Sequence, residues 1–428
     1  MRIRFCRDIV LNKIHITSVR HILLLLVFFI PWTWLGLYQY EIYIKEISVI
    51  FVFLFMFFKN IYNKENLIID SSGRIYILFL LVCIFYYFIE LLSLDSVDDR
   101  SFLTHVLLST ILNFVIYFIF INTKENKINL KLLIKILILM YFSIFIFFVV
   151  HSLEVHTLSK DLPGGYFTFE NLLQQSGMYN NYFGGNNGRS WFFLILTSFF
   201  VGYFISKNRF FYAFIFILSS LIVSYLLMSR GAMLFGIMLF ILFALRSMLT
   251  KTLSFNLGLY TFILLLFFGS NYADFNSLEL LQKKTGFSNR DFLVFESINL
   301  IFNDYLLGRG FHSLVLDGSD FLKMNFVYLS NTRPQNTFLS IFIELGVFGV
   351  FFYFLFWVTL FISFGNSIKL SRNSVEKHYL YGSRYMIIWI IFSFIFVHFF
   401  EKSFVATPIY MLIIGTAVSI KLYKRKIS

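Results

Sequence analysis

The sequence is poor in charged residues. Only 14% of its 428 residues are Asp, Glu, Lys or Arg, whereas 58% are apolar and 61 are phenylalanine. A soluble globular domain usually contains about 25% charged and roughly 45–50% apolar residues. The composition therefore excludes soluble enzymes, disulfide-rich secreted scaffolds and disordered proteins.

Cysteine is also scarce. Cys6 lies near the N-terminus and Cys83 lies inside an apolar segment, so we expect the two thiols at different levels of a bilayer. Two thiols held far apart cannot form a disulfide and supply too few ligands for a metal cluster. We therefore predict neither feature.

The apolar residues are concentrated in segments of about 17–25 residues, the length a helix needs to cross roughly 30 Å of hydrocarbon. This pattern predicts an all-α, polytopic integral membrane protein with about twelve transmembrane helices, formed by a single domain over residues 1–428. The first segment has no small-residue cleavage site after it, so we expect a retained signal anchor. The twelve predicted segments are 21–40, 43–58, 75–94, 102–122, 131–150, 190–206, 210–228, 231–249, 255–271, 335–365, 384–400 and 403–420.

The distribution of Lys and Arg predicts the orientation of these helices. With the N-terminus inside, 24 of the 36 basic residues fall on cytoplasmic segments, and only four fall on short outer loops. Basic residues accumulate on cytoplasmic loops because they resist translocation. We therefore expect both termini in the cytoplasm, and we attribute the net charge of +13 to this bias rather than to nucleic-acid binding.

Two connections are much longer than the others, and both are predicted to lie outside. They are the first long loop, residues 151–189, and the second, residues 272–334. Loops above about 12–15 residues usually carry function or are disordered, and these contain aromatic residues, glycines and isolated charges. In the second loop, Ser288 is a candidate N-cap for an amphipathic helix that ends near Asn303, followed by a glycine turn at 308–310.

Two arginines in this arrangement are unusual. Arg290 falls in the first turn of the predicted amphipathic helix, where free backbone N–H groups already favour an anion. Arg230 interrupts a continuous apolar stretch between two predicted spanning helices, and an intramembrane charge is a functional hypothesis by default. Two structural interpretations remain open: Arg290 reaches lipid headgroups, and Arg230 belongs to a tight hairpin that touches phospholipid.

A third group of residues follows the second long loop. Arg333 and Pro334 precede Gln335 and Asn336, which we expect at the outer mouth of a helix whose first turn contains the proline. Glu344 comes nine residues after Gln335, about 13 Å deeper by helical rise, and a carboxylate at that depth needs a partner or a hydrated cavity. We expect Gly346 and Gly349 to serve helix packing.

Taken in sequence order, the residues around Arg230, the second long loop with Arg290, and the segment 333–349 resemble the O-antigen polymerase and O-antigen ligase superfamily of Gram-negative inner membranes. That family has a Ser-Arg-Gly-Ala signature opening a helix, matched at 229–232, and an Arg in a large periplasmic loop, matched by Arg290. It also has an Asn-Pro-Leu-Leu-Gly-x-Gly-like turn, loosely matched at 303–311. Its final segment, His-Asn-x-Phe/Tyr-Leu followed by Glu-Leu-Gly-x-x-Gly, is matched at 335–339 and 344–349, with Gln335 replacing the histidine.

The resemblance implies an activity, a substrate class and a fold similar to that of the GT-C glycosyltransferases. The donor and the acceptor would be oligosaccharides on undecaprenyl diphosphate, and the partners would be membrane lipid and a chain-length regulator. Neither long loop contains an Asp-x-Asp triplet, so we expect no metal or other cofactor. Arg290 and Arg230 would bind the departing diphosphate, with Arg309 and Arg333 as secondary candidates.

Glutamine cannot titrate, so Gln335 cannot act as a general base, and this departure favours a polymerase over a ligase. Gln335, Asn336 and Glu344 are then candidates for substrate binding. His312 is a candidate base, with His156 as an alternative. We expect Asp291 to cap its helix or to pair locally, and His398 and Glu401 to face either the cavity or the membrane interface. Two other functions remain open: an O-antigen ligase acting on lipid A-core, and a flippase or transporter of lipid-linked oligosaccharides, although the two halves of the chain show no clear repeat.

Overall fold

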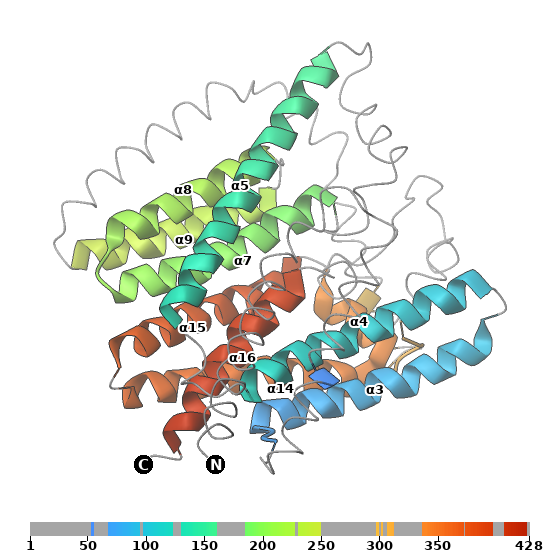
Figure 1. The fold of residues 1–428 in the computed structure, drawn as a ribbon. Helices are drawn as coiled ribbons and strands as arrows, with labels where there is room; N and C mark the ends of the chain where they lie inside the picture. Colours follow the sequence, from blue (N-terminus) through green and yellow to red (C-terminus); the bar gives the residue numbers. More distant parts are fainter. Residues whose placement is uncertain are drawn as a thin grey trace, which may run out of the picture.

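The computed structural model is all-helical in the part of the chain that it describes, and no β-strand occurs in that part (Figure 1). This confirms the predicted fold class at that level. The described residues are 53–54, 67–94, 97–122, 130–160, 185–226, 230–249, 297–298, 301–302, 306–311, 336–371, 373–396 and 406–425.

Nine helices make up most of these residues. They are α3 (Ser71–Ser93), α4 (Val97–Asn122), α5 (Leu130–Lys160), α7 (Gly185–Ser206), α8 (Phe210–Leu226), α9 (Arg230–Leu249), α14 (Thr337–Leu370), α15 (Ser374–Phe396) and α16 (Ala406–Arg425).

Each of the nine helices coincides with one of the twelve predicted apolar segments. Segments 21–40 and 255–271 lie outside the described residues, as does all of 43–58 except residues 53 and 54. The predicted loop 151–189 is partly wrong, because α5 continues to Lys160 and α7 already begins at Gly185. The apolar run that defined α5 ends before the helix does, since helical hydrogen bonding does not require apolar side chains.

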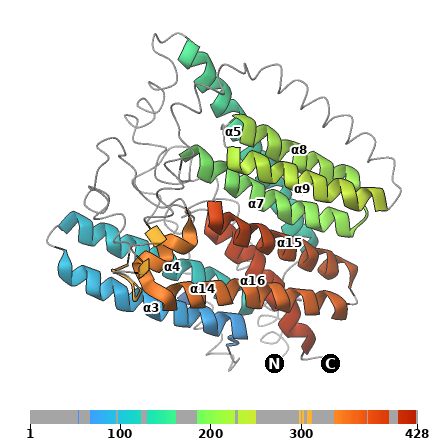
Figure 2. The same cartoon turned by 180° about the vertical axis from the view of Figure 1, so that it is seen from behind.

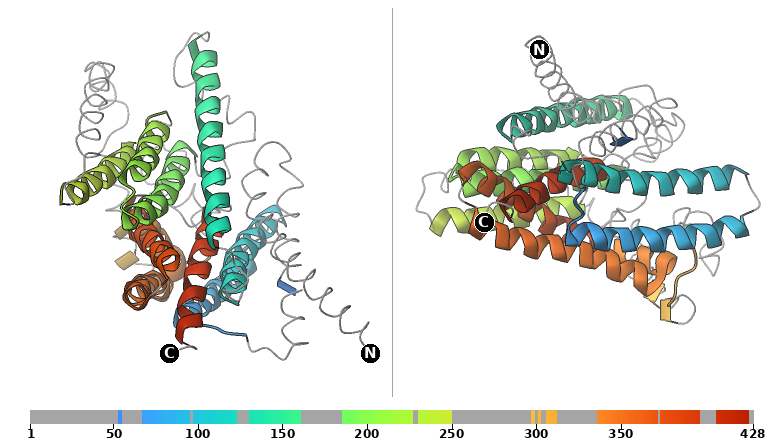
Figure 3. Two further views of the ribbon diagram at one scale, coloured as in Figure 1. Left: turned by 60° about the vertical axis from the view of Figure 1, so that its left-hand side comes forward. Right: turned by 60° about the horizontal axis from the view of Figure 1, so that its bottom comes forward.

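The helices pack as two groups, α3 with α4 and α7 with α8 and α9. Helices α14, α15 and α16 lie where the two groups meet. Helix α4 packs against α3 and α16, while α7 packs against α8, α9 and α15. Helix α14 contacts both α3 and α15 and so joins the two groups (Figure 2). The C-terminal end of α5 extends beyond the neighbouring helices (Figure 3).

Helix α3 exposes apolar side chains and buries polar ones, as expected for a helix in an apolar surrounding. Along α3, exposed large apolar residues recur every three or four positions, whereas the buried face carries a thiol, hydroxyls and a carboxylate. A helix in water shows the opposite arrangement, with its polar side chains outside. The exposed residues are Leu78, Leu81, Phe85, Phe88 and Leu92, and the buried ones include Cys83, Tyr86, Tyr87 and Glu90.

Within the described ranges, two helices, α3 and α14, are long and apolar enough to cross a membrane. On α14, Phe348, Phe351 and Phe354 form a similar exposed stripe. These two features suggest association with a membrane. The total of about twelve spans and the cytoplasmic position of both termini stay predictions.

A buried group of hydroxyls joins α5, α7 and α8. The Tyr141 hydroxyl lies 2.8 Å from Thr197 Oγ1 and 2.6 Å from Ser219 Oγ, and all three side chains are buried. Thr197 and Ser219 also donate to the carbonyls of Phe193 and Phe216 in their own helices. Both hydroxyls therefore keep a partner if Tyr141 loses its own.

We predict that Tyr141→Phe lowers the free energy of unfolding by about 1 kcal/mol, because it removes the hydrogen bonds between helices and leaves the ring in place. Thermal unfolding of the purified protein measures the change. Tyr225→Phe, at an exposed position of α8, is the matched control and should leave the midpoint unchanged. Equal midpoints for the two variants would contradict a stabilising role for the hydroxyl group.

Candidate functional site

The turn at residues 306–311 lies against α14 and α3, and it is the best-defined part of the candidate site. The sequence predicted a glycine turn at 308–310, and the structure confirms one there. Gly308 has a φ of 95°, in the region that favours glycine. Gly310 and Phe311 are buried.

Helix α14 is broken opposite this turn. Gly346 has φ 65° and ψ −166°, a conformation that is non-helical and essentially restricted to glycine. The helix therefore consists of two parts, which meet at Gly346. The expectation that Gly346 serves helix packing was wrong, because its role is to permit this break.

The turn supplies backbone hydrogen bonds at the break. In a continuous helix the Ile343 carbonyl would accept from the Val347 N–H. Here the Val347 N–H donates to the Leu306 carbonyl (3.2 Å), and the Ile343 carbonyl accepts from the Arg309 N–H (2.8 Å). The Glu344 carbonyl also accepts from the Gly310 N–H (3.1 Å). The turn thus replaces hydrogen bonding that the break removes.

Close backbone contact requires glycine on both sides. A Cβ atom added to Gly308 would lie 2.5 Å from the Gly346 nitrogen and 2.9 Å from the Glu344 carbonyl oxygen. A Cβ atom added to Gly346 would overlap the Leu307 carbonyl group. No larger residue fits at either position unless the two backbones separate.

Helix α3 holds the other side of the turn. The Tyr86 hydroxyl donates to the Leu307 carbonyl, and the Phe311 N–H donates to the Tyr86 carbonyl at 3.5 Å. The carboxylate of Glu90 lies directly against Gly310, at the place where a Cβ atom would stand. Glu90 is buried, with 6% of its surface exposed.

Two candidate residues named from the sequence fall in this region. Arg309 is half-buried in the turn, and its backbone is anchored to Ile343. Glu344 is completely buried, and its side chain interacts electrostatically with Cys83 of α3. The turn therefore brings Arg309 and Glu344 together, although 35 positions separate them in the sequence.

Asn336 is the N-cap of α14. Its side-chain oxygen accepts from the Leu339 N–H (3.1 Å), and its carbonyl accepts from the Ser340 N–H (3.1 Å). The helix consequently begins at Thr337, so the expected position of Pro334 in its first turn was wrong. Asparagine is among the residues favoured at an N-cap, because its side-chain oxygen accepts from a free N–H of the first turn.

The structure does not describe the side chains of the other candidates. Arg230 is the first residue of α9, as the resemblance implies for a signature that opens a helix, but its side chain is outside the described part. Entirely outside the described residues lie Arg290, His312, Arg333 and Gln335, as well as Asp291, His398 and Glu401. His156 belongs to α5, but its side chain is outside the described part. Of the predicted amphipathic helix, residues 297–298 and 301–302 are described, and they are helical.

The contribution of α3 was not predicted from the sequence. Glu90 and Tyr86 contact the turn, and neither was named as a candidate. A signal was present for Glu90, since it is a carboxylate within an apolar segment and the rule applied to Arg230 also covers it. Tyr86 carried no such signal, because tyrosine is common in this chain, with 25 copies.

Within the described ranges, no group of three or more His, Cys, Asp and Glu side chains is placed to hold a metal ion. A scan against models of known protein families matches none of them, and a search of curated proteins finds no significant match. The resemblance to one family therefore rests on the quoted motifs alone.

We predict that Gly346→Ala releases the turn from α14, because the added Cβ atom overlaps Leu307 and the backbone angles suit only glycine. We expect strain of about 2 kcal/mol, which lowers the protection of the backbone amides of the turn against hydrogen exchange roughly 30-fold. Hydrogen exchange at the Arg309 and Gly310 amides measures the effect. Gly365→Ala in the same helix faces the flexible end of the Arg384 side chain and is the control, with unchanged exchange.

We predict that the substitution Asn336→Ala removes the N-cap of α14 and that Asn336→Asp preserves it. Amides 338–340 of Asn336→Ala should exchange about fivefold faster, which corresponds to a loss of about 1 kcal/mol at the helix start. Asn336→Asp should exchange like the unmodified chain. If Ala and Asp behave alike, the capping hydrogen bond does not stabilise α14.

Proposed function

We propose that this protein is a polytopic membrane glycosyltransferase that polymerises O-antigen repeat units on undecaprenyl diphosphate at the periplasmic face of a bacterial inner membrane. One observation carries the proposal. Two motifs of the resemblance, the turn at 303–311 and the segment at 335–349, are far apart in the sequence, yet residues 306–310 bind residues 343–347 through their backbones.

The surface of the helices supports a membrane location. The exposed stripes of α3 and α14 are apolar, and their buried faces carry the polar groups. The bias of Lys and Arg in the sequence favours cytoplasmic termini, which puts residues 272–334 and the turn on the opposite side.

The proposed reaction transfers a glycan between lipid-linked sugars. A hydroxyl of the acceptor sugar attacks C1 of the donor, the bond between C1 and the diphosphate oxygen breaks, and the configuration at C1 inverts. The hydroxyl proton passes to a base, for which His312 is the candidate, and the diphosphate leaves with the bonding electrons. Negative charge therefore grows on the leaving group and must be neutralised.

Guanidinium groups suit this task because they bind phosphate oxygens with two parallel, charge-assisted hydrogen bonds. We assign it to Arg290 and Arg230, with Arg309 and Arg333 as secondary candidates. The backbone of Arg309 is anchored to α14, and this supports a role for its side chain in binding the diphosphate. A fixed backbone reduces the entropy lost when the side chain binds. Gln335 and Asn336 would bind the substrate, whereas Glu344 is completely buried and is assigned no contact with the sugar.

The test is the lipopolysaccharide of a deletion strain complemented with single variants. We predict that the deletion leaves core capped by one repeat unit and that the unmodified gene restores the long ladder. Arg230→Ala and Arg290→Ala should each leave single repeat units at unchanged protein level, because the diphosphate loses its cationic partner.

Arg209→Ala is the control for this experiment. Arg209 is exposed and lies on a predicted cytoplasmic segment, so the variant should restore the full ladder. A ladder of normal length from either Arg230→Ala or Arg290→Ala would contradict the assignment. Bare core in the deletion strain would show that the protein is a ligase, because a polymerase is not needed to attach the first repeat unit.

A further inference from the structure

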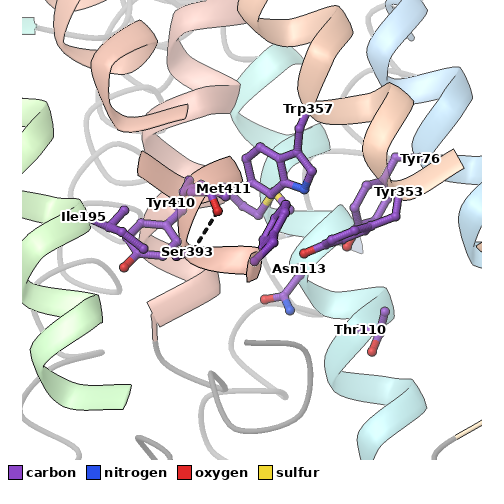
Figure 4. A pocket seen from close by; sticks show the side chains of 11 residues that line it. Tyr76, Thr110, Asn113, Ile195, Tyr353, Trp357, Ser393, Tyr410 and Met411 are labelled. Carbon is purple, nitrogen blue, oxygen red and sulfur yellow. Dashed lines mark hydrogen bonds between the residues drawn. The ribbon is translucent and has the colours of Figure 1, made fainter. Parts of the chain in front are cut away.

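A small cavity lies where the two groups of helices meet, away from the turn described above. Its walls come from α3, α4, α7, α14, α15 and α16 (Figure 4). Tyr76, Tyr353 and Trp357 supply aromatic rings, and Asn113, Ser393 and Tyr410 add an amide and two hydroxyls. The cavity therefore presents several polar groups on walls that are otherwise largely apolar.

The polar groups of the cavity are of two kinds. The Ser393 hydroxyl donates to the Ile390 carbonyl (2.6 Å), and the Tyr410 hydroxyl donates to the Phe192 carbonyl (3.1 Å). Both oxygens have committed their protons and can still accept hydrogen bonds. The Trp357 indole N–H can only donate, and the residue is 2% exposed; the Tyr353 hydroxyl of the same cavity lies near it, but no acceptor within the described residues meets the geometry of a hydrogen bond.

A buried donor that lacks a well-aligned acceptor costs about 1–3 kcal/mol. A molecule that accepts from Trp357 and donates to a hydroxyl oxygen would remove this cost. The Asn113 amide, half-buried on α4, provides both a donor and an acceptor at the same cavity.

The volume decides which molecule fits. The cavity holds about 40 Å³, whereas sites for small organic ligands measure about 300–1,000 Å³. A water molecule needs about 10–15 Å³ for its centre and occupies about 30 Å³ in the liquid. Sugars and lipid headgroups are too large, and one to about three water molecules fit.

We propose that this cavity is a site for ordered water, in which a bound water molecule accepts a hydrogen bond from Trp357 Nε1 and contacts the Asn113 amide. The water connects α14 with α4 through hydrogen bonds inside the seam between the two groups of helices. The proposal does not depend on the proposed function, because it concerns only the described side chains of the cavity.

The test uses the full chain with ¹⁵N-labelled tryptophan, in a nanodisc, and measures magnetisation transfer from water to each indole N–H. Trp357→Phe and Trp389→Phe identify the two signals. Trp389 is also buried but lies outside the cavity and packs on Phe235, so it is an internal control. We expect dipolar transfer from water at Trp357 and none at Trp389.

Asn113→Leu is the second variant, because it removes the amide and fills the space with an isobutyl group. It should weaken the transfer to Trp357 at least fivefold, while an unchanged Trp389 signal shows that the fold is intact. No transfer at Trp357, equal transfer at both indoles, or transfer by proton exchange alone would each overturn the proposal. Full transfer to Trp357 in Asn113→Leu would show that the bound water does not contact the Asn113 amide.

Discussion

The candidate site depends on backbone hydrogen bonds between the turn at 306–311 and the break in α14. A helix broken at Gly346 leaves N–H and C=O groups without their usual partners, and in an apolar surrounding each such group costs several kcal/mol. The turn provides the missing partners on both sides of the break. This is possible only because Gly308 and Gly346 let the two backbones approach each other without intervening Cβ atoms.

The same contact determines where the candidate side chains lie. Because the Arg309 N–H is fixed to the Ile343 carbonyl, the guanidinium group is tethered within reach of the break. Glu344 is buried at the end of the first part of α14, on the side of α3, and Asn336 caps the start of that part. A turn that separated from α14 would therefore move Arg309 away from Glu344. Stability of the fold and organisation of the site depend on one set of hydrogen bonds.

Apolar runs predicted the helices well, since the length of such a run in a bilayer is set by the thickness of the hydrocarbon. They did not predict the break in α14. In sequence, Gly346 inside an apolar run looks the same whether it allows two helices to pack or one helix to break, and only the partner at 306–311 distinguishes these roles. The contact of Glu90 with Gly310 was likewise beyond prediction, because it depends on the packing of α3. The cap at Asn336 was within reach, since asparagine is favoured at that position.

Disulfide trapping tests the central contact most directly. Leu306 and Val347 are joined by a backbone hydrogen bond and both side chains are exposed. In a background without Cys6 and Cys83, Leu306→Cys with Val347→Cys should form an intramolecular disulfide under mild oxidation, so that fragments cut within residues 312–333 stay linked until reduced. Leu306→Cys with Phe351→Cys, one turn further along α14, should link far more slowly. Equal linking of the two pairs, or none from the first pair although both thiols react with an alkylating reagent, would contradict a turn docked at the break.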